Sequence, residues 1–283
     1  MSTLDDREII DDEAVERRIE PARGSSRVLW DVIFAIVRRI FGVARNFYAT
    51  FGVFLLAGAL VAVVATWGFA ELAGHVRSGS TAAFDDSILT WFGRHHVKWL
   101  DEAMLEITAL GTGTVVLMVV AVSGMFLWLT EHRYSALLLM IATAGGILLN
   151  GLLKLGYGRP RPQIFAWGTS AVSWSFPSGH AMSATIVYGT VAYLAARLQK
   201  RRSHRIATLI SAAVFILLIA VSRLYLGVHY PSDVIAGIII GLAWASFCMA
   251  TLEALQVYAR NRAPHVVAHE QPAPGGALAP RVD

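Results

Sequence analysis

Three short polar clusters lie beside long apolar stretches of this chain of 283 residues. Together they hold side chains of the kinds that bind anions or take part in their chemistry: lysine, arginine, histidine, serine and one aspartate. The clusters are Lys154 with Arg161-Pro162, then Pro177-Ser178-Gly179-His180, then Ser222-Arg223 with His229 and Asp233. Charged groups next to hydrocarbon cost free energy, so they are usually kept there for a function. Guanidinium and ammonium groups pair well with phosphate, and these residue types therefore favour binding or transfer of a phosphate group.

In the first cluster, Lys154 closes an apolar stretch and is followed by Arg159-Pro160-Arg161-Pro162. Proline restricts its own backbone and that of the residue before it, so this segment is predicted to be extended. An extended segment can direct two guanidinium groups into one pocket. Lys154 and Arg161 would then contact the anion directly, and Arg159 would be a secondary anion contact. The alternative is a cluster at the membrane edge whose long side chains reach the headgroups.

The second cluster is predicted to open a helix. A helix N-terminus offers free backbone N–H groups and a dipole that favours an anion. Ser178 can cap this helix or donate to an oxyanion, and Gly179 lets the backbone approach a ligand closely. His180 can donate a proton to a leaving oxygen. The alternative is an ordinary helix cap followed by a histidine at the membrane interface.

In the third cluster, Arg223 ends an apolar stretch and His229 and Asp233 follow it. Pro231 suits the first turn of a helix, which places Asp233 in that turn and within reach of His229. A carboxylate on one ring nitrogen fixes the tautomer of a histidine and leaves the other nitrogen as a nucleophile or base. The alternative is a structural His–Asp pair at the start of a helix.

The apolar stretches that must position these clusters indicate an all-α membrane protein. The chain is 55% hydrophobic and 16% charged, with a mean hydropathy of +0.55, whereas soluble domains carry about 25% charged residues. Six stretches without charge lie between residues 45 and 71, 106 and 131, 133 and 154, 180 and 197, 205 and 223, and 233 and 253. We therefore predict a bundle of six transmembrane helices.

The segments around these helices divide the chain further. The membrane domain is predicted to span 47–256. Residues 1–27 and 257–283 are expected to be disordered cytoplasmic tails, because they are rich in charge or in Pro, Ala and Gly. Residues 28–46 have apolar positions at helical spacing with arginines between them, which indicates an amphipathic interfacial helix. The first outside loop, 71–106, is expected to form short interfacial helices that cap the bundle.

The distribution of positive charge orients the predicted bundle. With the N-terminus inside, 17 of the 24 Lys and Arg residues fall in cytoplasmic segments and 7 in outside loops, as the positive-inside rule requires. Both termini are then cytoplasmic, and all three polar clusters fall on the extracytoplasmic side. This bias accounts for the basic character of the chain, so no nucleic-acid partner is expected. Arginine outnumbers lysine 21 to 3, which favours a bacterial plasma membrane as the location.

The three clusters resemble the three signature motifs of the type 2 phosphatidic acid phosphatase superfamily. The matching residues are Lys154-x6-Arg161-Pro162, Pro177-Ser178-Gly179-His180 and Ser222-Arg223-x5-His229-x3-Asp233. The resemblance extends from about residue 48 to residue 255. The layout of six spans is similar to that of the integral-membrane branch of the family, and unlike that of its soluble acid phosphatases and vanadium haloperoxidases.

This resemblance implies a role for each residue of the site. His229 would attack phosphorus and form a phosphohistidine, Asp233 would orient the ring of His229, and His180 would protonate the leaving oxygen. The residues implied in holding the phosphate are Lys154, Arg161, Ser178, Gly179 and Arg223. The resemblance implies no metal and no cofactor.

The expected activity is hydrolysis of a lipid phosphate monoester or a polyprenyl pyrophosphate at the membrane. One alternative is phosphoryl or headgroup transfer to another acceptor by the same site. Another is a non-enzymatic lipid transporter or lipid-binding bundle. A haloperoxidase is less favoured, because the sequence shows no large soluble helical domain. The sequence defines neither the particular lipid nor the oligomeric state.

Overall fold

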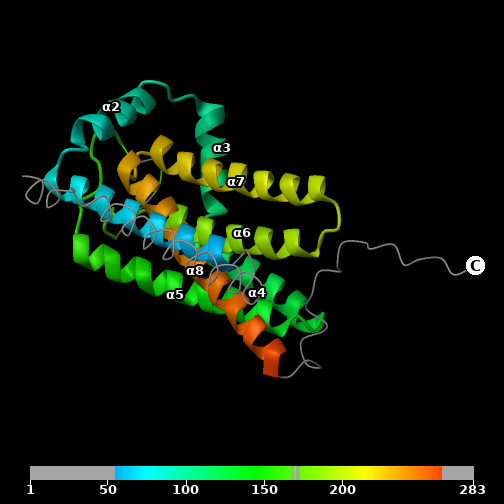
Figure 1. Cartoon of the computed structure of the whole chain (residues 1–283). Coiled ribbons are helices and arrows are strands. Elements are labelled where there is room, and N and C mark those ends of the chain that lie inside the picture. Colours follow the sequence, from blue (N-terminus) through cyan, green and yellow to red (C-terminus); the bar gives the residue numbers. More distant parts are fainter. Residues whose placement is uncertain (1–54, 167–168, 170–172, 263–283) are drawn as a thin grey trace, which may run out of the picture. The chain divides into compact units, whose positions relative to one another are not determined.

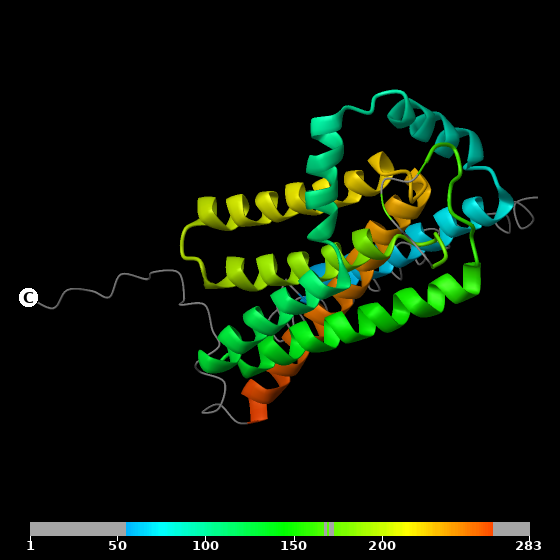
Figure 2. The same ribbon diagram turned by 180° about the vertical axis from the view of Figure 1, so that it is seen from behind.

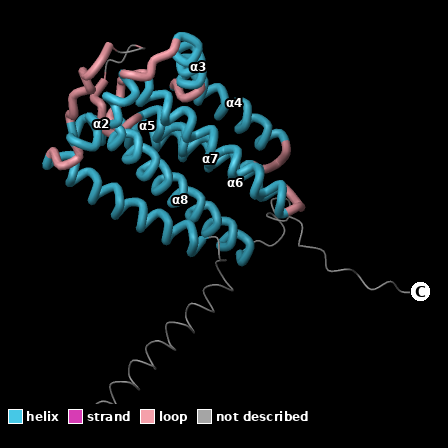
Figure 3. Tube along the Cα trace, turned by 90° about the horizontal axis from the view of Figure 1, so that it is seen from above, coloured by secondary structure: helices cyan, strands magenta, loops and turns pink. Residues whose placement is uncertain are grey.

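The structure is a computed structural model that describes residues 55–166, 169 and 173–262. All of them belong to one unit of the chain, Phe51–Asp283. These residues form helices and loops, and the described part contains no strand (Figure 3). The predicted segments 1–27 and 28–46 lie outside the described residues, as does the tail after residue 262.

Eight helices lie in the described part of the chain. The first is described from Leu55 to Ser78. The others are α2 (Ala82–Gly93), α3 (Lys98–Ala109), α4 (Gly113–Leu129), α5 (Arg133–Tyr157), α6 (Gly179–Leu198), α7 (Arg202–Tyr225) and α8 (Pro231–Arg262) (Figure 1). The last helix continues past residue 256, where the membrane domain was expected to end.

The prediction of an all-α membrane protein is confirmed. Five helices are long and apolar enough to cross a membrane: Leu55–Ser78, α5, α6, α7 and α8. The sixth span requires α3 and α4 together, which are joined by a bend of 49°. The stretch without charge after Glu106 therefore does not form one straight helix. The chain bends at Gly111, where an added Cβ would lie 2.6 Å from Ile219 and 2.9 Å from the ring of His180.

Helices α6 and α8 form the centre of the bundle, with about half of their apolar windows buried. Their contact depends on glycine in α8. A Cβ at Gly237 would lie 2.6 Å from the carbonyl oxygen of Ser178, and one at Gly241 would lie 2.9 Å from that of Met182. The small residues of α8 thus serve close packing inside one bundle. They bring the start of α8 directly against the start of α6.

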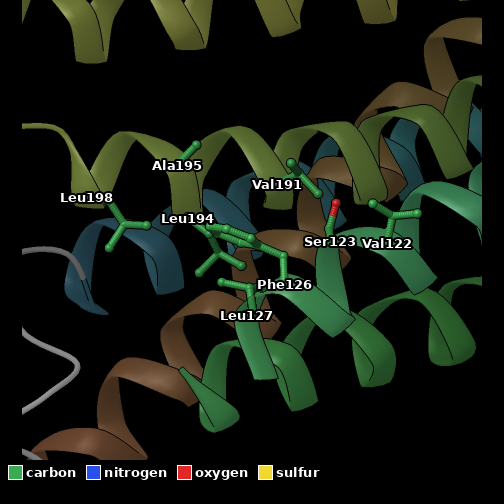
Figure 4. Close-up of a pocket in the computed structure, with 8 residues that line it drawn as sticks. All are labelled: Val122, Ser123, Phe126, Leu127, Val191, Leu194, Ala195 and Leu198. Carbon is green, nitrogen blue, oxygen red and sulfur yellow. The ribbon is translucent and has the colours of Figure 1, made fainter. Parts of the chain in front are cut away.

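The outward faces of the bundle are apolar. Large hydrophobic side chains are more than half exposed on several helices, among them Val63, Met125, Leu148, Ile210 and Phe247. Such a surface would be unstable in water but suits the hydrocarbon of a bilayer. An apolar pocket of about 300 Å³ also lies between α4 and α6 (Figure 4). Its lining residues are Val122, Ser123, Phe126, Leu127, Val191, Leu194, Ala195 and Leu198. The pocket adjoins the C-terminal half of α6, away from the polar start of that helix.

The segment 71–106, predicted to be the first outside loop, contains α2 and most of α3, so the prediction of short helices there is confirmed. Figure 2 shows α3 crossing its neighbour α7 steeply partway along its length, with α2 near the end at which α7 finishes. Helix α2 buries Asp85 and Leu89, one helical turn apart, against this end. The loop therefore covers the end of the bundle at which the polar clusters lie.

The α6–α8 contact generates a prediction for stability. Gly237→Ala would push a methyl group against the Ser178 carbonyl, and overpacking of this kind costs about 1–3 kcal/mol. We expect a lower unfolding temperature in detergent micelles. The matched control is Gly189→Ala in α6, since a Cβ there meets no atom within 4 Å. Equal unfolding temperatures for the two variants would contradict the importance of this contact.

Candidate active site

The three polar clusters meet at one end of the bundle, where α5 and α7 finish and α6 and α8 begin (Figure 1). Two short backbone links hold this end together. The Ser178 N–H donates to the Asp233 carbonyl at 2.9 Å, and the Ser175 N–H donates to the Arg159 carbonyl at 2.8 Å. Residues far apart in the sequence are therefore fixed beside one another by the backbone, before any side chain contributes.

His229 lies in the turn between α7 and α8 and is almost completely buried. The turn requires Gly227, whose φ is +70° and whose absent Cβ leaves room for the ring of Phe165. The Nε2 atom of His229 lies 3.2 Å from Nη1 of Arg161, and Nδ1 lies 3.3 Å from the hydroxyl of Ser175. Burial lowers the pKa of His229 to about 4, although Asp233 opposes this shift. The ring is therefore neutral at pH 7.

Asp233 lies in the first turn of α8, as the position of Pro231 predicted, and is fully buried. Its Oδ2 atom accepts from the backbone N–H of Tyr230 at 2.9 Å and from the hydroxyl of Ser175. The same oxygen is 3.5 Å from Nδ1 of His229. Ser175 thus contacts both the carboxylate and the ring, and the Ser175 hydroxyl adds a second link to the expected His–Asp pair.

Three cations adjoin His229, and the protein holds each of them in place. Arg161 donates to the carbonyls of Ser173 and Val228, both at 2.7 Å. Lys154 shares the Ser173 hydroxyl with Arg161, at 3.2 Å from Nζ. Arg223 donates from Nη1 to the hydroxyl of Thr108 at 2.6 Å, and its buried Nε has no partner among the residues that the structure describes. Their mutual repulsion would be relieved by a bound anion.

The start of α6 presents donors to the same place. Ser178 is the N-cap residue, but its side chain makes no capping bond, and its buried hydroxyl lacks a partner within the described part of the chain. Gly179 allows α5 to approach, because a Cβ there would lie 3.1 Å from Oδ1 of Asn150. His180 is half-buried in the first turn, beside Gly111 at the bend between α3 and α4. The Ser178 hydroxyl and the first N–H groups of α6 can therefore donate to an oxyanion.

Arg159, expected as a secondary anion contact, has different partners in the structure. Its Nη1 donates to Asp233 at 2.6 Å and to Ser232 at 2.8 Å, and its Nη2 donates to Asp85 at 2.8 Å. Two buried carboxylates attract this guanidinium more strongly than a site already lined by cations. Burial acts to lower the pKa of Arg159, but the two aspartates outweigh it and raise that pKa.

Four supporting residues were not identified from the sequence: Asp85, Thr108, Ser173 and Ser175. One of them did have a signal. Asp85 lies one turn before Leu89 on the buried face of α2, and a carboxylate on the apolar face of an amphipathic helix is unusual. The other three are small hydroxyl residues in ordinary contexts, and only the fold brings them to the cations.

Taken together, the arrangement suits a tetrahedral anion. Cations, a buried hydroxyl and a helix N-terminus can neutralise the oxygens of a phosphate. A neutral imidazole nitrogen beside those donors can attack phosphorus, since the ring carries no proton on that nitrogen when Nδ1 carries it. Among the described residues, no group of three His, Cys, Asp or Glu side chains could hold a metal ion.

Comparisons with known proteins identify the family of the chain. The model of the PAP2 superfamily matches residues 133–256, which include all three clusters. Phosphatidylglycerophosphatase B of Bacillus subtilis is 34% identical over 175 residues, covering 62% of this chain and 86% of the relative. Undecaprenyl-diphosphatase BcrC of the same species is 29% identical over 155 residues, covering 52% of this chain and 72% of the relative.

A solved structure gives the same result. It is the transmembrane PAP2 type phosphatidylglycerolphosphate phosphatase from Bacillus subtilis, which is 31% identical to this chain. The TM-score is 0.65, and the match covers 69% of this chain and 96% of the solved one. Because the motifs, the fold and the similarity over nearly the whole length of these relatives agree, the chain belongs to the PAP2 superfamily.

Proposed function

We propose that this protein is a membrane phosphatase that hydrolyses a lipid phosphate monoester or a polyprenyl pyrophosphate through a phosphohistidine on His229. The relatives that it resembles within the PAP2 superfamily are phosphatases, which supports a phosphatase activity. The finer proposal is carried by one observation: Nε2 of a buried, neutral His229 faces Arg161 instead of a hydrogen-bond acceptor. That nitrogen therefore carries the lone pair and accepts from the Arg161 N–H. A phosphate that takes over this N–H would free the lone pair for attack and be held in place by the same guanidinium.

In the first step, Nε2 of His229 forms a bond to phosphorus while the bond from phosphorus to the leaving oxygen breaks. Attack in line places the leaving oxygen on the side away from His229. There His180, which takes up a proton when the anionic phosphate binds among the cations, gives that proton to the leaving oxygen. Lys154, Arg161 and Arg223, with the Ser178 hydroxyl, hold the remaining oxygens. Most of the rate enhancement then comes from positioning and from charge stabilisation.

In the second step, a water molecule attacks phosphorus and the bond to Nε2 breaks, which releases phosphate and restores His229. His180, now neutral, accepts the proton of the water. Asp233 stabilises the positive charge that the ring carries while it is phosphorylated. This sequence uses only groups of the chain itself, so the proposal includes no metal.

The lipid nature of the substrate is supported by the position of the site. It lies at the end of helices whose outer faces are apolar, so a phosphate on a membrane lipid can reach it without leaving the bilayer. The two named relatives act on a lipid phosphate and on a polyprenyl diphosphate by their names. The bias of Lys and Arg toward the other loops supports an extracytoplasmic site with both termini cytoplasmic.

The activity itself is tested with purified protein in detergent. Phosphate release is measured from phosphatidic acid, phosphatidylglycerol phosphate and undecaprenyl pyrophosphate, with EDTA present. We expect release from at least one of them, and none from His229→Ala, because the nucleophile is lost. The matched control is His204→Ala, an exposed histidine at the start of α7. Activity in His229→Ala, or no release from any of the three lipids, would refute the proposal.

The ionisation of His229 is a second prediction. Burial lowers its pKa to about 4, below the ordinary value of about 6.5, so the neutral nucleophile should persist to mildly acidic pH and be protonated only near pH 4. The measurement is a titration by NMR of protein labelled with ¹³C in histidine. The His229 signal is assigned by its loss in His229→Gln. A measured pKa of 6.5 or higher would show that the ring is not buried as described.

Ser178 provides a third prediction. Removal of one oxyanion donor commonly lowers kcat on the order of 100-fold, so Ser178→Ala should lose most of its activity. Its stability should be unchanged or higher, because the Ser178 hydroxyl is buried without a described partner and its removal breaks no bond. Activity and thermal unfolding are measured on the same preparation. If Ser178→Ala lost activity and also unfolded at a clearly lower temperature, the hydroxyl would have a structural role instead.

A further inference from the structure

Asp85 is a fully buried carboxylate that lies outside the three motifs. It belongs to α2 in the first outside loop, far in sequence from the residues that it contacts. Its Oδ1 accepts from the backbone N–H of Ser232 at 2.9 Å, and its Oδ2 accepts from the Ser232 hydroxyl at 2.6 Å and from Nη2 of Arg159 at 2.8 Å. Three donors thus hold it at the start of α8.

Arg159 connects this carboxylate to the site. One terminal nitrogen of the guanidinium donates to Asp85, and the other donates to Asp233. The guanidinium also lies over the ring of Tyr230, 4.1 Å from its centre. A chain of contacts therefore runs from Asp85 through Arg159 and Asp233 to His229, and it contains two carboxylates and one permanent cation.

We propose that Asp85 is a positioning residue of the phosphatase site, which balances the charge of Arg159 and thereby keeps the negative charge of Asp233 available to His229. This inference rests on the proposed phosphohistidine chemistry. Asp85 touches neither the substrate nor His229 and acts only through Arg159 and the start of α8.

Three charged groups, Asp85, Arg159 and Asp233, together decide how much negative charge lies beside His229. Arg159 alone would neutralise Asp233, because their nitrogen and oxygen lie 2.6 Å apart in a buried place where charges are weakly screened. Asp233 would then do little to stabilise a positively charged, phosphorylated ring. With Asp85 on its other side, Arg159 is paired twice, and the group of three keeps a net charge of −1 next to His229.

Asp85 also holds the first turn of α8 in place. A carboxylate is favoured at a helix N-terminus, and Asp85 occupies one of the free N–H groups there. It also binds the Ser232 side chain, next to Asp233 in sequence. Since Leu89 is buried one turn further along α2, this short helix is attached to the site by a charged and an apolar contact. The first outside loop therefore has a structural part in the site.

The test begins with Asp85→Asn, which keeps the shape and one acceptor oxygen but removes the charge. The matched control is Asp86→Asn, its exposed neighbour on the same helix. We expect kcat to fall roughly tenfold or more, which is the usual effect of losing one hydrogen bond to a charged group. KM should change little, because the groups that bind the phosphate are untouched. The control should behave as the wild type.

The decisive readout is the pKa of His229 in the resting protein, measured by the histidine titration described above. Removing a negative charge should lower it further than in the wild type. A merely structural role would loosen the site, admit water and move the pKa up toward 6.5. The charged and titratable groups around His229 on the neighbouring elements are Asp233, Arg159, Arg161, Arg223, His180 and Lys154. All of these groups are retained in Asp85→Asn.

A charge-balanced double variant, Asp85→Asn with Arg159→Gln, guards against simple misfolding. It removes one charge of each sign, so the pKa of His229 and kcat should both return toward the wild type relative to Asp85→Asn alone. A double variant that is worse than either single variant, or a raised pKa in Asp85→Asn, overturns the proposal. The titration needs no turnover, so the role of Asp85 can fail while the phosphatase function stands, and an inactive wild type would refute only the function.

Discussion

The site depends on one contact, the meeting of the first turns of α6 and α8. Glycine in α8 lets its backbone lie against the Ser178 carbonyl, and the Ser178 N–H in turn binds the Asp233 carbonyl at 2.9 Å. Two helix N-termini with their positive dipole ends are thereby brought together, which is unfavourable unless negative charge lies between or beside them. The buried Asp233 and Asp85 supply part of that charge, and a bound phosphate would supply the rest.

Four cations lie around this contact between α6 and α8, and within the described part of the chain only one of them is neutralised by carboxylates. Arg159 is paired with carboxylates, whereas Arg161, Arg223 and Lys154 are held mainly by neutral oxygens of Ser173, Thr108 and the backbone. Neutral partners fix the direction of a cation but leave its charge in place. Arg159 therefore differs from the other three cations, although Arg159 and Arg161 are only two positions apart in the sequence.

Much of this could be predicted from the sequence, for physical reasons. Long uncharged stretches can only be helices in a bilayer, and the breaks at Gly158 and Pro231 fix where α5 ends and α8 begins. The partners of Arg159 could not be predicted, because the local pattern Arg-Pro-Arg-Pro treats both arginines alike. Their different roles arise from Asp85, about 70 residues earlier in the chain. The bend at Gly111 did have a local signal, the pair Gly111 and Gly113, but the uncharged stretch around it was predicted as one span. The contact of Gly111 with His180 and Ile219 could only be seen in the fold.

The contacts of α2 and α3 with the site also show how much of the chain the site needs. The region that matches the family model, residues 133–256, contains every motif residue. It does not contain Asp85 or Thr108, which are the partners of Arg159 and Arg223. A truncated chain cut at those limits would keep the complete signature and yet deprive Arg159 of one of its two carboxylates and Arg223 of its hydroxyl partner. Any exchange of α2 and α3 in this chain would therefore have to keep a carboxylate for Arg159 and a hydroxyl for Arg223.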